Sequence, residues 1–360
     1  MNAPDLDQPR TYRDLDPSGL RDRIAGLGTQ CGEAWVAAQG LALPAGYGGV
    51  RRMVVLGMGG SAIGADLVAG LLAGVAPVPV LTVRGYELPS YVGDEDLVVA
   101  SSYSGETAEV LSAVETAARR GGRMVALTSG GRLGAMARER GWPLLTVPYR
   151  GEPRSALGWG MLPLLAWAQQ LGLIPPQDAA AAEASGWLGR MAGELGPDRP
   201  LAANPAKALA ARLHQRLPVI YGAGILSPVA RRWKGQFNEN AKSWAAWDEL
   251  PELNHNAVCG YEQPEAARDL VMVIFLEAVG LDRRLAARYE VTRRLLDRRG
   301  VAHAAVGGRG ESPLAQVLTT VVFGDWVSYY AALLNGVDPA PVPAIDFVKA
   351  ELARGCTSPK

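Results

Sequence analysis

A loop rich in hydroxyl groups is the first part of this chain whose residue types could do chemistry. Residues 102–107 read Ser-Tyr-Ser-Gly-Glu-Thr and follow the apolar run 97–101. Hydroxyl groups together with backbone N–H groups can hold a phosphate monoester without a metal ion. Helix capping explains one hydroxyl group here, because Ser and Thr are favoured N-cap residues, but it does not explain three. We therefore predict that Ser102, Ser104 and Thr107 bind a phosphate group.

A second loop carries the glycines that would complete such a site. Residues 57–61 read Gly-Met-Gly-Gly-Ser and follow the apolar run 53–56. Glycines let an anion approach the backbone, and the start of the following helix offers free N–H groups and the positive end of its dipole. Gly60 and Ser61 are therefore predicted to contact the same phosphate.

The same glycines leave a second interpretation open, an NADP-dependent oxidoreductase. Gly57, Gly59 and Ala62 match the G-x-G-x-x-G/A dinucleotide pattern. Arg84 follows the run 78–83, where an NAD site would have Asp or Glu, and an arginine there could bind the 2′-phosphate of NADP. The hydroxyl groups of residues 102–107 favour a sugar phosphate over a dinucleotide. The lack of a Walker lysine after the glycines of residues 57–60 also argues against a nucleotide.

Alternating strands and helices must position these loops. Apolar, β-branched runs predict buried strands at 53–56, 78–83, 97–101, 124–128 and 144–147, with helices after Gly105, Gly131 and Ser155. This is the pattern of an α/β fold with a doubly wound parallel sheet.

The second half of the chain repeats the pattern of a strand, a glycine turn and a helix. A run at 218–221 leads into Gly222-Ala223-Gly224 and a helix from about Ser227, and further strands are expected at 270–275 and 301–306. We therefore predict an internal duplication with two parallel-sheet domains. Residues 1–195 would form the first domain, with a leading helix and the phosphate loops, and residues 196–360 the second, with a C-terminal tail helix.

Both loops resemble those of the sugar isomerase (SIS) domain, which carries Gly-Gly-Ser and Ser-x-Ser-Gly-x-Thr after two of its strands. The second half is more specific. Residues 233–242, WKGQFNENAK, and 249–256, ELPELNHN, resemble the bifunctional phosphoglucose/phosphomannose isomerase family. The resemblance extends from about Arg51 to Lys349.

This resemblance implies roles for individual residues. Glu239 would be the catalytic base and His255 would assist ring opening, with Arg154 and Lys349 as further catalytic residues. Gly60, Ser61, Ser102, Ser104 and Thr107 match the family's phosphate site. The family's members are homodimers whose histidine comes from the partner chain, and they need neither a cofactor nor a metal.

These residue types suit aldose–ketose isomerisation. A carboxylate such as Glu239 is ionised at neutral pH and can move the C2 proton to C1. A guanidinium group such as that of Arg154 can hold the charge of the enediolate. The imidazole of His255, with Lys349 as helper, can transfer the proton that opens the ring. Each residue also has a structural alternative, such as a surface pair between Glu239 and Lys242 or a polar turn at 254–256.

The chain departs from the family pattern in three places. Glu106 stands where Asn is common, and its carboxylate must point away from the ligand. Ser155 replaces the usual alanine after Arg154. Pro341-Val342-Pro343 occupies the region of a threonine credited with admitting the second sugar epimer, so the resemblance supports the glucose 6-phosphate activity more directly than the mannose 6-phosphate activity.

Composition narrows the class of protein. The chain has 360 residues and a formal net charge of zero, which gives no sign of a nucleic-acid or membrane partner. The N-terminus lacks an apolar signal segment, and an apolar stretch near 270–281 is too short to span a membrane. Cys31, Cys259 and Cys356 have no metal-ligand spacing and are expected to be reduced thiols.

The resemblance, together with this composition, predicts a cytoplasmic, homodimeric isomerase of carbohydrate metabolism, in glycolysis and gluconeogenesis. Its substrates would be glucose 6-phosphate and mannose 6-phosphate, each interconverted with fructose 6-phosphate through a cis-enediol. A non-catalytic regulatory SIS protein that binds sugar phosphate is the alternative.

Overall fold

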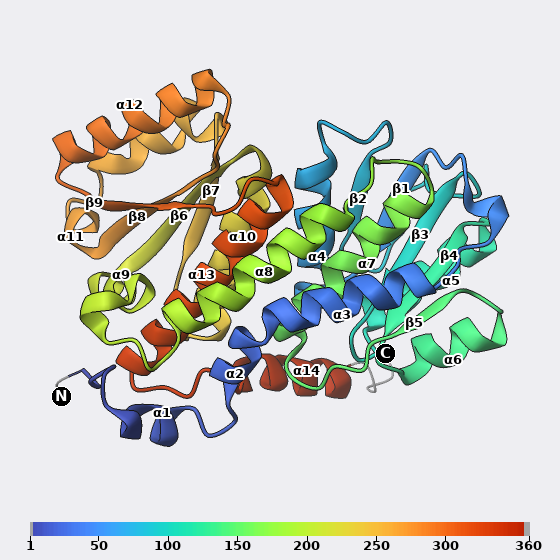
Figure 1. The fold of residues 1–360 in the computed structure, drawn as a ribbon, viewed down its shortest axis with the longest axis horizontal. Coiled ribbons are helices and arrows are strands. Elements are labelled where there is room, and N and C mark those ends of the chain that lie inside the picture. The colour runs from blue at the N-terminus through green and yellow to red at the C-terminus, as the bar shows by residue number, and fades with distance from the viewer. Residues whose placement is uncertain (1–2, 356–360) are drawn as a thin grey trace.

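The computed structural model describes residues 3–355 and contains two parallel β-sheets with helices packed between and around them (Figure 1). The first sheet has the order β2-β1-β3-β4-β5 and the second the order β7-β6-β8-β9. The strands are β1 (Arg52–Leu56), β2 (Val80–Val83), β3 (Asp96–Ser101), β4 (Arg123–Thr128), β5 (Leu144–Thr146), β6 (Leu217–Ala223), β7 (Ala246–Leu250), β8 (Val271–Glu277) and β9 (Ala302–Gly307). The predicted α/β fold with two doubly wound parallel sheets is confirmed.

Eight of these nine strands lie at the predicted apolar runs, and β7 is the exception. Its sequence, Ala-Trp-Asp-Glu-Leu, contains two adjacent acidic residues and only its last side chain is buried. It is an edge strand paired with β6 alone. An edge strand does not need a continuous apolar run, because solvent covers part of it.

In each sheet the strand that comes first in the chain lies inside the sheet, with the next two strands on opposite sides of it. In the first sheet β2 lies on one side of β1 and β3 on the other, and β7 and β8 flank β6 in the same way. The helices that follow β1 and β3 therefore lie on opposite faces of the sheet, and the carboxyl ends of two such strands are where ligands bind in open α/β sheets. The two predicted phosphate loops, 57–61 and 102–107, are the loops that follow β1 and β3.

The longest helix, α13 (Pro313–Leu334), forms the centre of the molecule and is buried along its whole length. It packs against α8 (Asp178–Leu195), α9 (Pro205–Leu213) and α10 (Ser227–Glu239). Within residues 3–355 it is the one helix long and apolar enough to cross a membrane, and every residue of that apolar window is buried in the protein. A helix that is apolar on all sides is typical of such a core.

Two other helices lie side by side and run in opposite directions, and this arrangement builds the site. α4 (Gly59–Leu72) packs against α10 in the opposite direction. A Cβ atom placed on Gly70, near the end of α4, would lie 2.9 Å from Pro228 at the start of α10. The start of α4 and the end of α10, at Glu239, consequently lie together.

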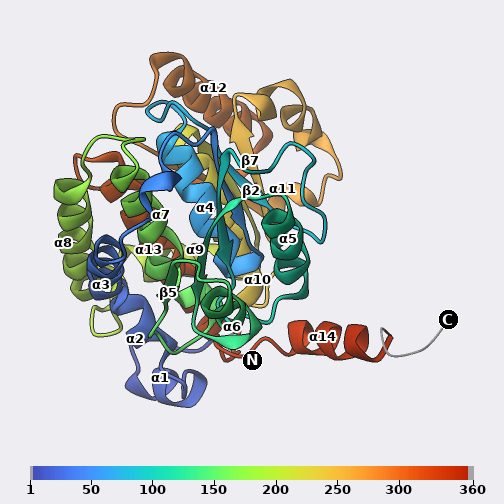
Figure 2. The same cartoon turned by 90° about the vertical axis from the view of Figure 1, so that its right-hand side faces the viewer.

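The N-terminal region holds three helices where one leading helix was predicted. These are α1 (Pro9–Leu15), α2 (Leu20–Ala25) and α3 (Leu27–Gly40), and α3 packs against α7 (Leu157–Gln170) and α8. The outer layers contain α5 (Ala108–Arg119), α6 (Gly131–Glu139), α11 (Ala267–Leu270) and α12 (Arg283–Arg299). The last helix, α14 (Pro343–Gly355), projects away from the body of the protein (Figure 2).

Candidate active site

A cleft of about 370 Å³ lies where the start of α4 faces the end of α10. Its lining includes Gly60, Arg154 and Glu239, three residues predicted to act on substrate. The Glu239 carboxylate lies 3.6 Å from Nη1 of Arg154. The side chain of Glu239 is 30% exposed and that of Arg154 only 4%, so the carboxylate can reach a ligand in the cleft while the guanidinium group forms its fixed wall.

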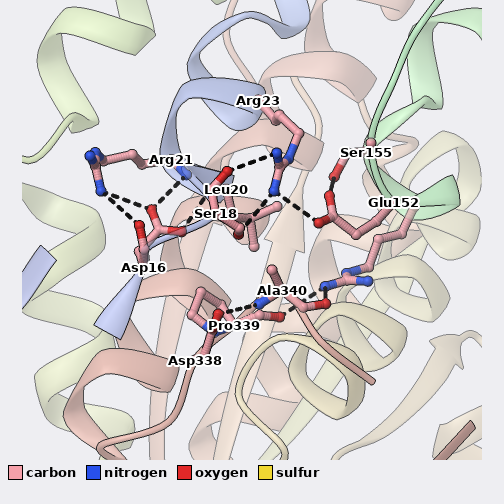
Figure 3. Close-up of polar contacts among 12 residues, drawn as sticks. Asp16, Ser18, Leu20, Arg21, Arg23, Glu152, Ser155, Asp338, Pro339 and Ala340 are labelled. Atoms are coloured by element: carbon pink, nitrogen blue, oxygen red, sulfur yellow. Dashed lines mark hydrogen bonds and ion pairs between the residues drawn. The ribbon is translucent and has the colours of Figure 1, made fainter. Parts of the chain in front are cut away.

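Arg154 is held rigidly by its other nitrogen atoms. It lies in a short 3₁₀ turn, Pro153–Ser155, and its Nε donates a hydrogen bond of 2.8 Å to Oδ1 of Asn240. Nη2 donates to the carbonyl oxygens of Pro339 and Ala340, each at 2.8 Å; Figure 3 shows these two carbonyl groups. Burial lowers the pKa of Arg154 and the charge of Glu239 opposes that shift, but an arginine keeps its proton in proteins. The site therefore contains a fixed positive charge beside Glu239.

Asn240 is the residue that orients Arg154, and it is almost completely buried. Besides accepting from Arg154, it donates from Nδ2 to Oγ of Ser328 at 3.0 Å, and Ser328 donates to the carbonyl oxygen of Asp325 at 2.9 Å. The Asp325 carboxylate in turn accepts from Arg232, 2.8 Å away, which also donates to the carbonyl oxygen of Arg154.

The sequence prediction missed Asn240 and Asp325. A signal for Asp325 was present, because it is the one ionisable carboxylate within the apolar helix 313–334. A buried charge of this kind needs a partner, and Arg232 supplies it. For Asn240 the sequence offered only its place next to Glu239.

The N-terminal helices hold the loop that carries Arg154. Gln30 of α3 is 4% exposed, donates to the carbonyl oxygen of Ser155 at 2.9 Å and accepts from the backbone N–H of Gly158 at 2.6 Å. Arg23 donates to the Glu152 carboxylate at 2.9 Å (Figure 3). These contacts link a region to which the sequence assigned no role with the wall of the cleft.

The two predicted phosphate loops contact each other. The backbone N–H of Tyr103 donates to Oγ of Ser61 at 3.1 Å, and Oγ of Ser101 donates to the carbonyl oxygen of Ser61 at 3.1 Å. Since β1 and β3 are adjacent, the structure brings Gly60 and Ser61 beside the loop that contains Ser102, Ser104 and Thr107.

Hydrogen bonds inside that second loop fix its hydroxyl groups. Oγ of Ser102 lies 2.8 Å from Oγ1 of Thr107 and accepts from the backbone N–H of Gly105. Ser104 accepts from the backbone N–H of Glu106. The Glu106 carboxylate is bound to Arg132, whose hydrogen bonds lower its pKa, so it does not compete for the hydroxyl groups.

His255 and Lys349 lie elsewhere in the chain. Neither residue lines the cleft of Glu239. His255 ends a short 3₁₀ turn, Glu252–His255, and its exposed side chain makes no hydrogen bond with any described residue. Lys349 is exposed on the projecting helix α14. A single chain therefore does not assemble all four predicted catalytic residues.

Lys242 contacts Glu239 in an unexpected way. The sequence left open a surface pair between the two side chains, but Nζ of Lys242 donates to the backbone carbonyl oxygen of Glu239 at 2.6 Å and to that of Pro339 at 3.1 Å. Partial burial and the charge of Arg154 lower the pKa of Lys242 to about 8. Lys242 and Arg154 thus share the Pro339 carbonyl group.

Residues 3–355 contain no group of three or more His, Cys, Asp or Glu side chains arranged to hold a metal ion. Cys31 is buried, and burial raises its pKa to about 12, which makes it an unreactive thiol. Cys259 is exposed. Cys356 lies outside the described residues.

Comparison with known proteins adds to this geometry. Residues 49–139 match the SIS domain, and residues 202–352 match the C-terminal SIS domain of bacterial phospho-glucose isomerase.

Two relatives are each named bifunctional phosphoglucose/phosphomannose isomerase. The one from Caldicellulosiruptor bescii is 38% identical over 307 residues, 84% of this chain and 90% of the relative. The one from Aquifex aeolicus is 34% identical over 84% of this chain and 91% of the relative.

Among solved structures, a glucose-6-phosphate isomerase like protein from Thermus thermophilus superimposes with a TM-score of 0.64 at 22% identity, covering 94% of this chain and 98% of that one. At this identity the likeness shows a shared fold.

Proposed function

This chain belongs to the bifunctional phosphoglucose/phosphomannose isomerase family, and we propose that it interconverts glucose 6-phosphate and fructose 6-phosphate, and also mannose 6-phosphate and fructose 6-phosphate. The observation that carries this proposal is the pair of Glu239 and Arg154 in one cleft, a base that can reach a ligand beside a fixed positive charge. Such a pair suits proton transfer through a cis-enediol, in which negative charge develops on the substrate oxygens.

The phosphate group of the substrate would bind at the carboxyl ends of β1 and β3. At the start of α4, Gly60 offers its backbone N–H group and the positive end of the helix dipole, and Ser61 offers its hydroxyl group, since the backbone N–H of Ser61 donates to the carbonyl oxygen of Met58. Ser102, Ser104 and Thr107 would add hydroxyl donors from the neighbouring loop. Because the cleft of Glu239 also begins at Gly60, a phosphate held here would direct the sugar towards the carboxylate.

Glu239 would take the C2 proton and return it at C1. Nη1 of Arg154 would hold the enediolate oxygens during this transfer, since the other nitrogen atoms of Arg154 are already engaged. Glucose and mannose 6-phosphates differ only at C2, which is planar in the enediol, so one intermediate can serve both. The reaction needs no cofactor.

We further propose that the protein is a homodimer in which a second copy supplies the imidazole of His255. α14 supports an assembly of this kind, because Ile345, Phe347, Val348 and Leu352 leave large apolar side chains exposed on it. Contiguous exposed apolar side chains are typical of surfaces that bind another protein. Lys349 on the same helix would then act near a site formed by both copies.

The remaining proposals concern organisation and setting. We place the boundary between the two SIS domains at 195/196, where α8 ends, and we place the enzyme in the cytoplasm, in glycolysis and gluconeogenesis.

The test is turnover of each hexose 6-phosphate by the wild type and by Glu239→Gln. We expect Glu239→Gln to lose nearly all turnover and to keep its affinity for fructose 6-phosphate, because the amide preserves shape and removes the base. Glu290→Gln, on the exposed surface of α12, is the matched control and should turn over normally. A wild type that binds fructose 6-phosphate without turnover would identify the regulatory alternative.

A further inference from the structure

The cleft of Glu239 carries more positive charge than a hexose monophosphate requires. Besides Arg154, its lining includes Arg84, Arg231 and Lys234. The sequence singled out Arg84 as the residue that could bind an NADP phosphate, and the proposed isomerase function does not use it.

One carboxylate is shared by two of these arginines. Asp66 of α4 lies 2.5 Å from Nη2 of Arg84 and 3.3 Å from Nη1 of Arg231. The group therefore keeps one net positive charge. The side chains of Arg84 and Arg231 are 25% and 42% exposed, against 15% for Asp66, so the guanidinium groups are more accessible to a ligand than the carboxylate between them.

Lys234 adds a second net positive charge. It lies on α10, three residues after Arg231, and lines the same cleft. Within residues 3–355 its ammonium group has no hydrogen bond or ion pair. A cation in a cleft without a partner can bind an anion without first breaking another contact.

These cations lie apart from the proposed phosphate loops. Arg84 follows β2, whereas the two predicted phosphate loops follow β1 and β3. The strands β2 and β3 lie on opposite sides of β1. Gly59 and Gly60 at the start of α4 line the same cleft as these cations, and the next residue, Ser61, contacts the loop 102–107. Glu239 and the three cationic side chains thus line the cleft, and the loop with the hydroxyl groups lies next to it, in contact with Ser61.

We propose that Arg84, Arg231 and Lys234 form a second anion subsite that takes the 1-phosphate of a hexose 1,6-bisphosphate. This proposal rests on the proposed function for the position of the 6-phosphate, at Ser61 and the hydroxyl loop. A sugar with a phosphate on its anomeric oxygen cannot open its ring, so it binds without being isomerised. The bisphosphate is therefore an inhibitor that competes with the substrate.

The test is calorimetric titration with glucose 1,6-bisphosphate and with glucose 6-phosphate. We expect the wild type to bind the bisphosphate at least about tenfold more tightly, since a charge-assisted hydrogen bond contributes about one such factor. Arg84→Gln and Arg231→Gln should each lower this preference by about tenfold. Asp66→Asn should keep or raise the preference, because it frees both guanidinium groups.

The contrast between these variants separates ligand binding from a purely structural role. If Asp66, Arg84 and Arg231 only tie α4, β2 and α10 together, the variants Asp66→Asn, Arg84→Gln and Arg231→Gln lower the melting temperature and leave the preference unchanged, and the proposal is wrong. It is also wrong if the wild type shows no preference. Arg140→Gln, which removes a guanidinium group paired with Glu115 on the surface, is the control and should change neither quantity.

Glucose 1-phosphate, a third ligand, tests the second anion subsite alone. Its binding shows whether the subsite proposal fails independently of the isomerase proposal. Binding of glucose 1-phosphate should weaken in Arg84→Gln and stay unchanged in Ser102→Ala, and binding of glucose 6-phosphate should weaken in Ser102→Ala. These titrations do not depend on turnover. Turnover of glucose 6-phosphate with no preference for the bisphosphate would overturn the subsite alone.

Discussion

The guanidinium group of Arg154 has a partner at each nitrogen atom. Asn240 accepts from Nε, the carbonyl oxygens of Pro339 and Ala340 accept from Nη2, and Nη1 faces Glu239. Preorganised charges of this kind stabilise a transition state without reorganisation during the reaction. The position of this one group therefore depends on residues far apart in the chain.

Removal of the Asn240 amide should reduce catalysis more than binding. In Asn240→Ala, Nε of Arg154 would be buried without an acceptor. A buried donor without a partner costs about 1–3 kcal/mol in free energy. We expect kcat to fall about tenfold to a hundredfold with a smaller change in KM, measured by steady-state kinetics.

Asn238→Ala is the control for that variant. The Asn238 amide donates to the carbonyl oxygen of Ser243 and has no contact with Arg154. Equal losses of kcat in both variants would show that Asn240 does not act through Arg154.

Lys242 should make stability depend on pH in the alkaline range. Its pKa is about 8 in the folded protein, against an ordinary 10.5. Between these values the unfolded chain binds more protons than the folded one, so this group's contribution to stability increases as pH rises from 8 to 10.5. We expect the melting temperature of the wild type, relative to that of Lys242→Gln, to increase between pH 7.5 and pH 10. A constant or falling difference would contradict this assignment.

At the level of elements, the position of the N-terminal part of α4 in the site depends on how closely α4 and α7 approach each other. A Cβ atom on Gly64 would lie 2.3 Å from the carbonyl oxygen of Gly160. A Cβ atom on Gly60 would lie 2.7 Å from the carbonyl oxygen of Pro153, the residue before Arg154. Glycine at these two positions lets α4 contact both α7 and the loop that carries Arg154.

Gly64→Ala should therefore destabilise the protein. Backbone atoms must move to admit the methyl group, at a cost of about 1–3 kcal/mol in the free energy of unfolding, measured by denaturant titration. Gly189→Ala in α8 is the matched control, because a Cβ atom there contacts nothing within 4 Å. It should be neutral or stabilising by about 0.5–1 kcal/mol, since alanine favours a helix interior. The same loss in both variants would exclude the steric explanation.

At the level of the whole molecule, the exposed positions of His255 and Lys349 are explained if two copies share each site. Glu239→Gln and His255→Ala would each inactivate a homodimer. A heterodimer of the two variants would contain one site with both native residues, as two-fold symmetry requires.

Coexpression of the two variants should restore activity. Random pairing makes half of the dimers mixed, each with one of its two sites intact, so we expect about a quarter of wild-type activity. Size-exclusion chromatography with light scattering would establish the dimer. An inactive preparation that contains mixed dimers would show that His255 acts within its own chain, and an active His255→Ala homodimer would show that His255 has no catalytic role.

The sequence by itself determined the parts of the fold that depend on local chemistry. A strand buried on both faces needs a continuous apolar run, so β1 and β3 were predictable from their own residues. The loops that follow them were predicted to bind phosphate because glycine and hydroxyl residues suit a turn beside an anion. Glu239 and Arg154 were predicted as site residues because the residues around them resemble family motifs, and the structure lines one cleft with both. β7 was missed because an edge strand has no such requirement.

Only the tertiary structure decided which distant side chains meet. Asn240 contacts Arg154, Arg232 contacts Asp325, and Arg84 and Arg231 share Asp66, and none of these pairs has a spacing that predicts contact. These contacts depend on how α4, α10 and α13 cross, which the packing of their buried side chains sets. The same packing leaves His255 and Lys349 outside the cleft of their own chain.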